Sequence, residues 1–167
     1  MDRIIHTDVY EKNMEAYSKA YPKDAQKFRD GQYKKSNCTV TLVNAYDDTP
    51  TFLVSAENDK SYMLSGVYEP KTFLKKQIEG FGRIAPNTPF IVMGMGNMQQ
   101  VKMYLEAAGE DCLILVYEPS IEIFEMVMET IDISELILDK PILLVVDQLN
   151  EQDLKNAIRM MIKLDTV

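Results

Sequence analysis

A glycine-rich turn followed by an acidic residue is the feature of this sequence best suited to bind a ligand. Residues 94–97 read Gly-Met-Gly-Asn, directly after the apolar run 90–93 and before a segment with helical spacing. Glycines at such a junction let the backbone approach a ligand, and the N-terminus of the following helix favours negative charge. Glu118 lies 22 residues after Gly96 and ends the next apolar run, where an acidic side chain commonly bonds ribose hydroxyls. The residues predicted to contact a cofactor are Gly94, Gly96, Asn97 and Glu118.

The ligand class is narrowed by what the turn lacks. The third glycine of a G-x-G-x-x-G motif would fall at Gln99, so the sequence disfavours a dinucleotide. Lys102 is the only cation close to the turn, and the sequence has no GxxxxGK(S/T) loop, which argues against a self-sufficient phosphotransferase. The pattern still allows three kinds of ligand: a nucleotide sugar, a nucleoside or S-adenosylmethionine. In the alternative interpretation, the glycines only form a tight turn, and Glu118 caps the next helix together with Ser120.

Other catalytic chemistry is limited by the residue types present. His6 is the only histidine, and the two cysteines, Cys38 and Cys112, lie far apart without a CxxC motif. Ser-His-Asp catalysis, Cys-His catalysis and His-ligated metal sites are therefore excluded, and we predict no metal site and assign no catalytic residue. Asp147 follows a later apolar run and could contact a base or a magnesium ion. The simpler interpretation of Asp147 is a solvated strand end.

The composition describes an ordinary globular protein with an acidic second half. The chain has 167 residues, of which 46% are hydrophobic and 26% charged, and its net charge is −8. No lysine or arginine lies between Lys102 and Lys140, a stretch that contains ten carboxylates, so a nucleic-acid partner is not expected. No apolar run reaches the ~18 residues that span a bilayer, and the N-terminus shows no secretory signal. We therefore expect a cytoplasmic protein without membrane contact.

The segments around the glycine turn are predicted to form a parallel α/β unit. Three short apolar runs, 90–93, 112–117 and 142–146, alternate with segments whose apolar residues recur at helical spacing. Such alternation is typical of parallel strands joined by right-handed crossovers. The helix expected after the second run is predicted to turn Phe124 inward and Glu122 outward. The predicted fold class is α/β, a Rossmann-like three-layer half with the order βαβαβα and parallel strands, preceded by a helix and a small β-meander.

The chain is predicted to begin with an amphipathic helix. Asp8, with Glu11 three residues later, forms a capping-box pattern at its start, and Pro22 ends or bends it. Tyr17 and Tyr21 belong to one apolar stripe of this helix. We interpret that stripe as a core face rather than as a stacking platform for a ligand.

A β-meander is expected next. Strands are predicted at 39–46, 51–55 and 60–65, separated by turn residues, and a helix is predicted to start at Pro70. The predicted domain organisation is residues 1–38 as an N-terminal helical segment, residues 39–85 as the β-meander with its helix, and residues 86–167 as the Rossmann-like unit.

Three short motifs, at residues 62–70, 90–96 and 116–119, occur in order along the sequence. Together they resemble the motility accessory factor (Maf) family of flagellin glycosyltransferases. Residues 62–70, Tyr-Met-Leu-Ser-Gly-Val-Tyr-Glu-Pro, look like a family segment with Ser, Tyr-Asp/Glu and Pro. In that family the segment is followed by a helix, a strand with a Gly-x-Gly turn, and a strand that ends in Glu-Pro. The same order is present here, with the second and third motifs at 90–96 and 116–119. The anchors of the resemblance are Ser65, Tyr68, Pro70, Gly94, Gly96, Glu118 and Pro119.

The resemblance implies a role in glycosylating flagellin or a surface protein with a nonulosonic, sialic-acid-like sugar in a bacterial cytoplasm. Sugar transfer in that family is attributed to a central domain that lies beyond this portion. We therefore expect a non-catalytic N-terminal domain whose partner is flagellin or another acceptor protein. Two alternatives are a small S-adenosylmethionine- or nucleotide-binding enzyme of methyltransferase type, and a protein-interaction module that forms a homo-oligomer.

Overall fold

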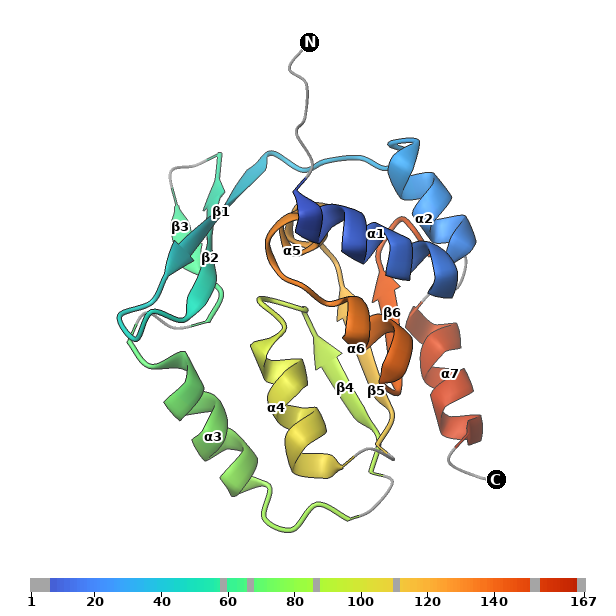
Figure 1. Ribbon diagram of the computed structural model, residues 1–167. Coiled ribbons are helices and arrows are strands. Elements are labelled where there is room, and N and C mark those ends of the chain that lie inside the picture. The colour runs from blue at the N-terminus through green and yellow to red at the C-terminus, as the bar shows by residue number, and fades with distance from the viewer. Residues whose placement is uncertain are drawn as a thin grey trace.

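The protein is an α/β structure with two separate three-stranded sheets (Figure 1). The computed structural model describes residues 7–57, 60–65, 68–85, 88–109, 112–150 and 154–164. One sheet is antiparallel, with the strand order β1-β2-β3, and the other is parallel, with the order β4-β5-β6. The predicted fold class, a Rossmann-like βαβαβα half preceded by a helix and a β-meander, is confirmed.

Two helices open the described chain, α1 (Asp8–Ala20) and α2 (Pro22–Arg29). The predicted cap is wrong by one residue: the Thr7 hydroxyl accepts a hydrogen bond from the Tyr10 N–H, and Asp8 is already helical. Threonine can cap as aspartate does, while an acidic residue in the first turn still favours the helix dipole. Pro22 separates the two helices as predicted.

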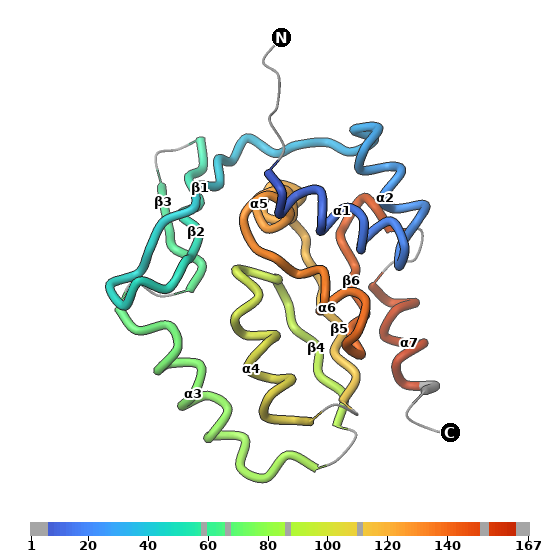
Figure 2. Tube along the Cα trace, viewed as in Figure 1, coloured from blue at the N-terminus to red at the C-terminus, as the bar shows by residue number. Residues whose placement is uncertain are grey.

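The apolar stripe of α1 is a core face, as predicted. Tyr17 is fully buried, and its ring lies 5.2 Å from that of Phe124, centroid to centroid. Asn13, also fully buried, donates to the carbonyl oxygens of Met128 and Ile131. These contacts fix the start of the chain against a segment more than 100 residues later, and Figure 2 shows α1 lying across that segment.

The β-meander consists of β1 (Cys38–Asn44), β2 (Pro50–Ala56) and β3 (Ser61–Met63), all antiparallel. It confirms the expected three strands, although the third is shorter than predicted. α3 (Pro70–Gly80) begins at its proline, where the missing N–H costs nothing, and runs beside α4.

The parallel sheet carries helices on both faces. Its elements are β4 (Phe90–Met93), α4 (Gln99–Ala108), β5 (Ile114–Glu118), α5 (Ile121–Thr130), α6 (Ser134–Asp139), β6 (Ile142–Val146) and α7 (Leu154–Leu164). Residues of α4, α5 and α6 share one core cluster with the meander and the N-terminal helices, whereas α7 packs on the opposite face of the sheet. The short helix α6 was not predicted.

The predicted outward orientation of Glu122 is wrong. This side chain is only 9% exposed, and its carboxylate accepts hydrogen bonds from the backbone N–H and the hydroxyl of Ser36. The segment between α2 and β1 therefore crosses the start of α5 and covers it. Helical periodicity could not reveal this contact, because the covering residue lies 86 positions earlier in the chain.

No helix in the described part of the chain is both long enough and apolar enough to cross a lipid bilayer.

Candidate functional site

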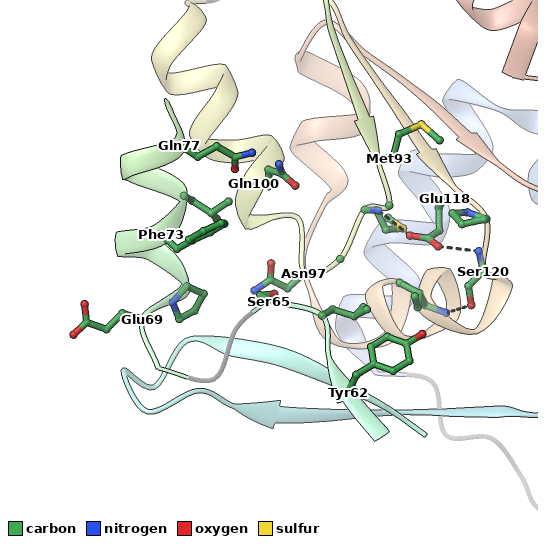
Figure 3. Close-up of a pocket in the computed structure, with 18 of the residues that line it drawn as sticks. Tyr62, Ser65, Glu69, Phe73, Gln77, Met93, Asn97, Gln100, Glu118 and Ser120 are labelled. Carbon is green, nitrogen blue, oxygen red and sulfur yellow. Dashed lines mark hydrogen bonds between the residues drawn. The ribbon is translucent and has the colours of Figure 1, made fainter. Parts of the chain in front are cut away.

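A cavity of about 710 Å³ lies between the meander with α3 and the carboxyl ends of β4 and β5 (Figure 3). Ligands in open α/β sheets bind at this edge of the sheet, because the helix N-termini and the connecting turns gather there. The lining residues are Tyr62, Leu64, Ser65, Tyr68, Glu69, Pro70, Phe73, Leu74, Gln77, Met93, Gly94, Met95, Gly96, Asn97, Gln100, Glu118, Pro119, Ser120 and Ile123.

The turn between β4 and α4 requires glycine for conformational reasons. Gly94 and Gly96 have φ values of +87° and +48°, in the left-handed region that side chains disfavour. A Cβ atom added at either position meets no atom within 4 Å, so space is not the constraint. The Gly94 N–H donates to the Tyr117 carbonyl at 2.7 Å, which holds the turn on the sheet.

The N-terminus of α4 is left open toward the cavity. Its N-cap residue, Met98, is itself left-handed with φ +62° and offers no side-chain cap. The Asn97 side chain accepts from the Gln99 N–H at 3.1 Å and donates to the Pro50 carbonyl, so it joins this turn to β2. Among the described residues, none accepts a hydrogen bond from the N–H groups of Gly96, Asn97 or Gln100.

Glu118 joins the two strand-to-helix turns that border the cavity. It is 1% exposed, and its two carboxylate oxygens accept from the Met95 N–H at 2.7 Å and the Ser120 N–H at 2.8 Å. Burial raises the pKa of Glu118, and the two backbone hydrogen bonds oppose that rise. Each oxygen therefore already has a backbone partner. A ribose would have to share Glu118 with the backbone, and cofactor contact through this residue stays a prediction.

The turn between β5 and α5 is closed by side chains. The Ser120 hydroxyl caps α5 by accepting from the Ile123 N–H at 3.3 Å, and it donates to Glu122 at 2.7 Å. Burial acts to raise the pKa of Glu122, but hydrogen bonds from Ser120 and Ser36 outweigh it and hold the pKa below its usual range. This geometry matches the alternative interpretation, in which Glu118 and Ser120 together cap the next helix.

Residues from three separate motifs meet at this one cavity. Ser65, Tyr68 and Pro70 precede or begin α3, whereas the glycine turn and the Glu118-Pro119 pair follow β4 and β5. The four residues predicted to contact a cofactor, Gly94, Gly96, Asn97 and Glu118, all line it. The sequence patterns did not single out the lining residues Phe73 and Gln77 as ligand contacts. The i,i+4 spacing of Phe73 and Gln77 was a usable signal, but it is also what an ordinary core face shows.

The described lining of the cavity contains no lysine or arginine. Lys102 is not part of it, and the Glu69 carboxylate points away from the other labelled side chains in Figure 3. Phosphate groups are usually bound through arginine, lysine or magnesium, so this lining suits an uncharged ligand better than a diphosphate.

Asp147 does not contribute a side chain to the cavity. Its side chain is exposed, and its backbone N–H donates to the Glu118 carbonyl at 2.8 Å. Across the described ranges, no three histidine, cysteine, aspartate or glutamate side chains are grouped to hold a metal ion. The geometry therefore fits the solvated strand end better than a magnesium ligand.

Comparison with known proteins gives a fold-level likeness. Searches find no matching protein family and no matching curated protein. Among solved structures, the Maf glycosyltransferase from Magnetospirillum magneticum AMB-1 matches 94% of this chain with a TM-score of 0.56 and 14% identity. This chain spans 29% of the length of that protein. A protein-L-isoaspartate O-methyltransferase matches 82% of this chain and 41% of its own, with a TM-score of 0.38 and 15% identity.

Proposed function

We propose that this chain is an N-terminal, non-catalytic domain of a Maf-like system that glycosylates flagellin or another surface protein with a nonulosonic sugar. The observation that carries the proposal is the shared fold with the Maf glycosyltransferase over 94% of this chain. The position of the motif anchors supports it, because Ser65, Tyr68, Gly94 and Glu118 come from different segments and line one cavity.

The proposed role is to bind or position a component of the reaction rather than to transfer the sugar. An acid or base of glycosyl transfer needs a carboxyl group that can reach the substrate. The Glu118 carboxylate accepts hydrogen bonds from two backbone N–H groups instead, and the Glu69 carboxylate points away from the other labelled lining side chains in Figure 3. A methyltransferase-like enzyme is less well supported, because the acidic residue that would receive the ribose hydroxyls already bonds the turn backbone.

Deletion of the gene for this chain tests the proposal in the organism that carries it. We expect intact-protein mass spectrometry to show flagellin or another surface protein losing the mass of its nonulosonic glycan. A copy of the wild-type gene should restore that mass. Unchanged masses for all surface proteins in the deletion strain would contradict the proposed function.

A further inference from the structure

Several polar groups that line the cavity have no hydrogen-bond partner among the described residues, and all of them are neutral. No described residue hydrogen-bonds the side-chain amide of Gln77 or the hydroxyl of Tyr62. Gln100 donates to the Tyr104 hydroxyl at 2.8 Å and keeps its amide oxygen and a second N–H for a ligand. In Figure 3 the side chains of Gln77, from α3, and Gln100, from α4, point toward one another across the cavity. These groups supply donors and acceptors without supplying charge.

Backbone groups and one hydroxyl extend the same chemistry. The N–H groups of Gly96 and Asn97 have no described acceptor, as noted for the start of α4. Ser65 accepts from the Thr51 hydroxyl at 3.0 Å, so its own O–H can donate to a ligand. A ligand that carries several hydroxyl groups could satisfy these donors and acceptors together, because each hydroxyl both donates and accepts.

Aromatic side chains stand at the border of the cavity with much of their surface in solvent. Tyr62, Tyr68 and Phe73 are 56%, 73% and 69% exposed. None of the three rings is buried in the core, and burying such rings against a ligand is favourable. Aromatic faces beside amide groups match an uncharged sugar, whose C–H faces stack on rings while its hydroxyls bond amides. A nucleotide or an anionic sugar would find backbone N–H groups but no cation among the described lining residues.

We propose that this cavity binds an uncharged sugar ring, such as a neutral pyranose residue of a glycan. The proposal goes beyond the function proposed above, on which it relies for its biological setting, because the neutral ring is a component other than the anionic nonulosonic sugar. The glycine turn then serves as a source of backbone donors rather than as a phosphate site. Its direct test is binding to the purified chain, which does not depend on the outcome of gene deletion.

Ligand-detected NMR and calorimetric titration with defined probes test this assignment. The neutral probes are the methyl glycosides of glucose, galactose, mannose and N-acetylglucosamine. The competing probes are adenosine, CMP-N-acetylneuraminic acid, CTP and S-adenosylmethionine, with and without magnesium. We expect saturable binding of at least one neutral glycoside and weaker binding of every competing probe. Absence of binding by all four glycosides, or tighter binding of any competing probe, overturns the proposal.

Variants on the exposed face of α3 locate the binding. Phe73→Ala should weaken the affinity for the bound glycoside about tenfold, the loss typical of one removed aromatic contact. Gln77→Ala should weaken it as well, whereas Lys76→Ala, next to it and outside the cavity, should leave it within about twofold. All three positions are exposed, so the variants should fold, which circular dichroism checks. Unchanged affinity in both cavity variants would place the binding elsewhere and overturn the proposal.

Discussion

The two strand-to-helix turns that border the cavity solve the same structural problem in opposite ways. At the start of α5, Ser120 caps the helix and Glu122 and Ser36 surround the cap. At the start of α4, the N-cap residue Met98 has no capping side chain, and several N–H groups are left without described partners. The turn between β5 and α5 is therefore capped by the protein's own side chains, whereas the turn between β4 and α4 keeps N–H groups without a described acceptor.

Glu118 is the link that makes this difference possible. It belongs to the turn between β5 and α5, the closed turn, through its hydrogen bond from the Ser120 N–H. It belongs to the turn between β4 and α4, the open turn, through its hydrogen bond from the Met95 N–H. The Gly94 N–H and the Asn97 side chain also hold the glycine turn, and Glu118 adds its link to the neighbouring turn. One buried carboxyl group therefore preorganises the open turn while keeping its outer donors accessible.

Glu118→Ala should have the largest effect, because it disconnects the two turns. The substitution leaves the buried Met95 N–H and the partly buried Ser120 N–H without acceptors, and the loss of a buried acceptor costs about 1–3 kcal/mol. We expect a loss of about 2–5 kcal/mol in the free energy of unfolding, measured by urea denaturation. Glu106→Ala, on the exposed side of α4, should change stability by less than about 0.5 kcal/mol. Similar values for the two variants would show that Glu118 does not hold the turns.

Gly94→Ala should come next, because it strains only the open turn. The alanine must adopt a φ of +87°, which costs about 1–2 kcal/mol although its Cβ meets no neighbour. Gly80→Ala is a matched control, since Gly80 is helical and its added Cβ is equally unobstructed. That control should stabilise the protein, by up to about 1 kcal/mol. Equal effects of the two alanines in urea denaturation would mean that the left-handed conformation is not needed.

Ser120→Ala should weaken only the closed turn. Loss of an N-cap hydroxyl typically costs about 1 kcal/mol. Ser120→Thr keeps the hydroxyl and should retain most of that stability, as thermal melting of the two variants can show. If alanine and threonine destabilise equally, steric fit rather than capping explains the role of Ser120.

Much of the fold around the two turns could be predicted from the sequence, and what could not be predicted has a physical cause. The strands, the parallel alternation and the glycine turn follow from local apolar runs and glycine spacing, as the observed β4 and β6 show by starting and ending where predicted. Two features could not be predicted: the burial of Glu122, and the hydrogen bond that Glu118 accepts from the Met95 N–H. They depend on Ser36 and Met95, which lie in other segments. Tertiary contacts decide what a charged residue does, and a single sequence does not contain them.

The smallest expected effect is in the pH titration of two neighbouring carboxyl groups, those of Glu118 and Glu122. Burial raises the pKa of Glu118 above the ordinary value of 4.5, whereas hydrogen bonds hold the pKa of Glu122 below it despite burial. The stability due to Glu118 is fully present below its unfolded pKa and is lost as pH rises through the folded pKa. The stability due to Glu122 is present above its unfolded pKa and is lost as pH falls through the folded pKa.

Carboxyl carbon NMR can follow both groups, with Glu118→Gln and Glu122→Gln assigning the signals. We expect the Glu118 midpoint above 4.5 and the Glu122 midpoint below it. The charge of Glu122 contributes to the raised pKa of Glu118, so Glu122→Gln should lower the Glu118 midpoint. In Glu118→Gln, the fall in unfolding free energy that this group causes above its unfolded pKa should disappear. A Glu118 midpoint below 4.5 would mean that the two backbone donors outweigh burial, and that both turns hold their carboxylates charged in the same way.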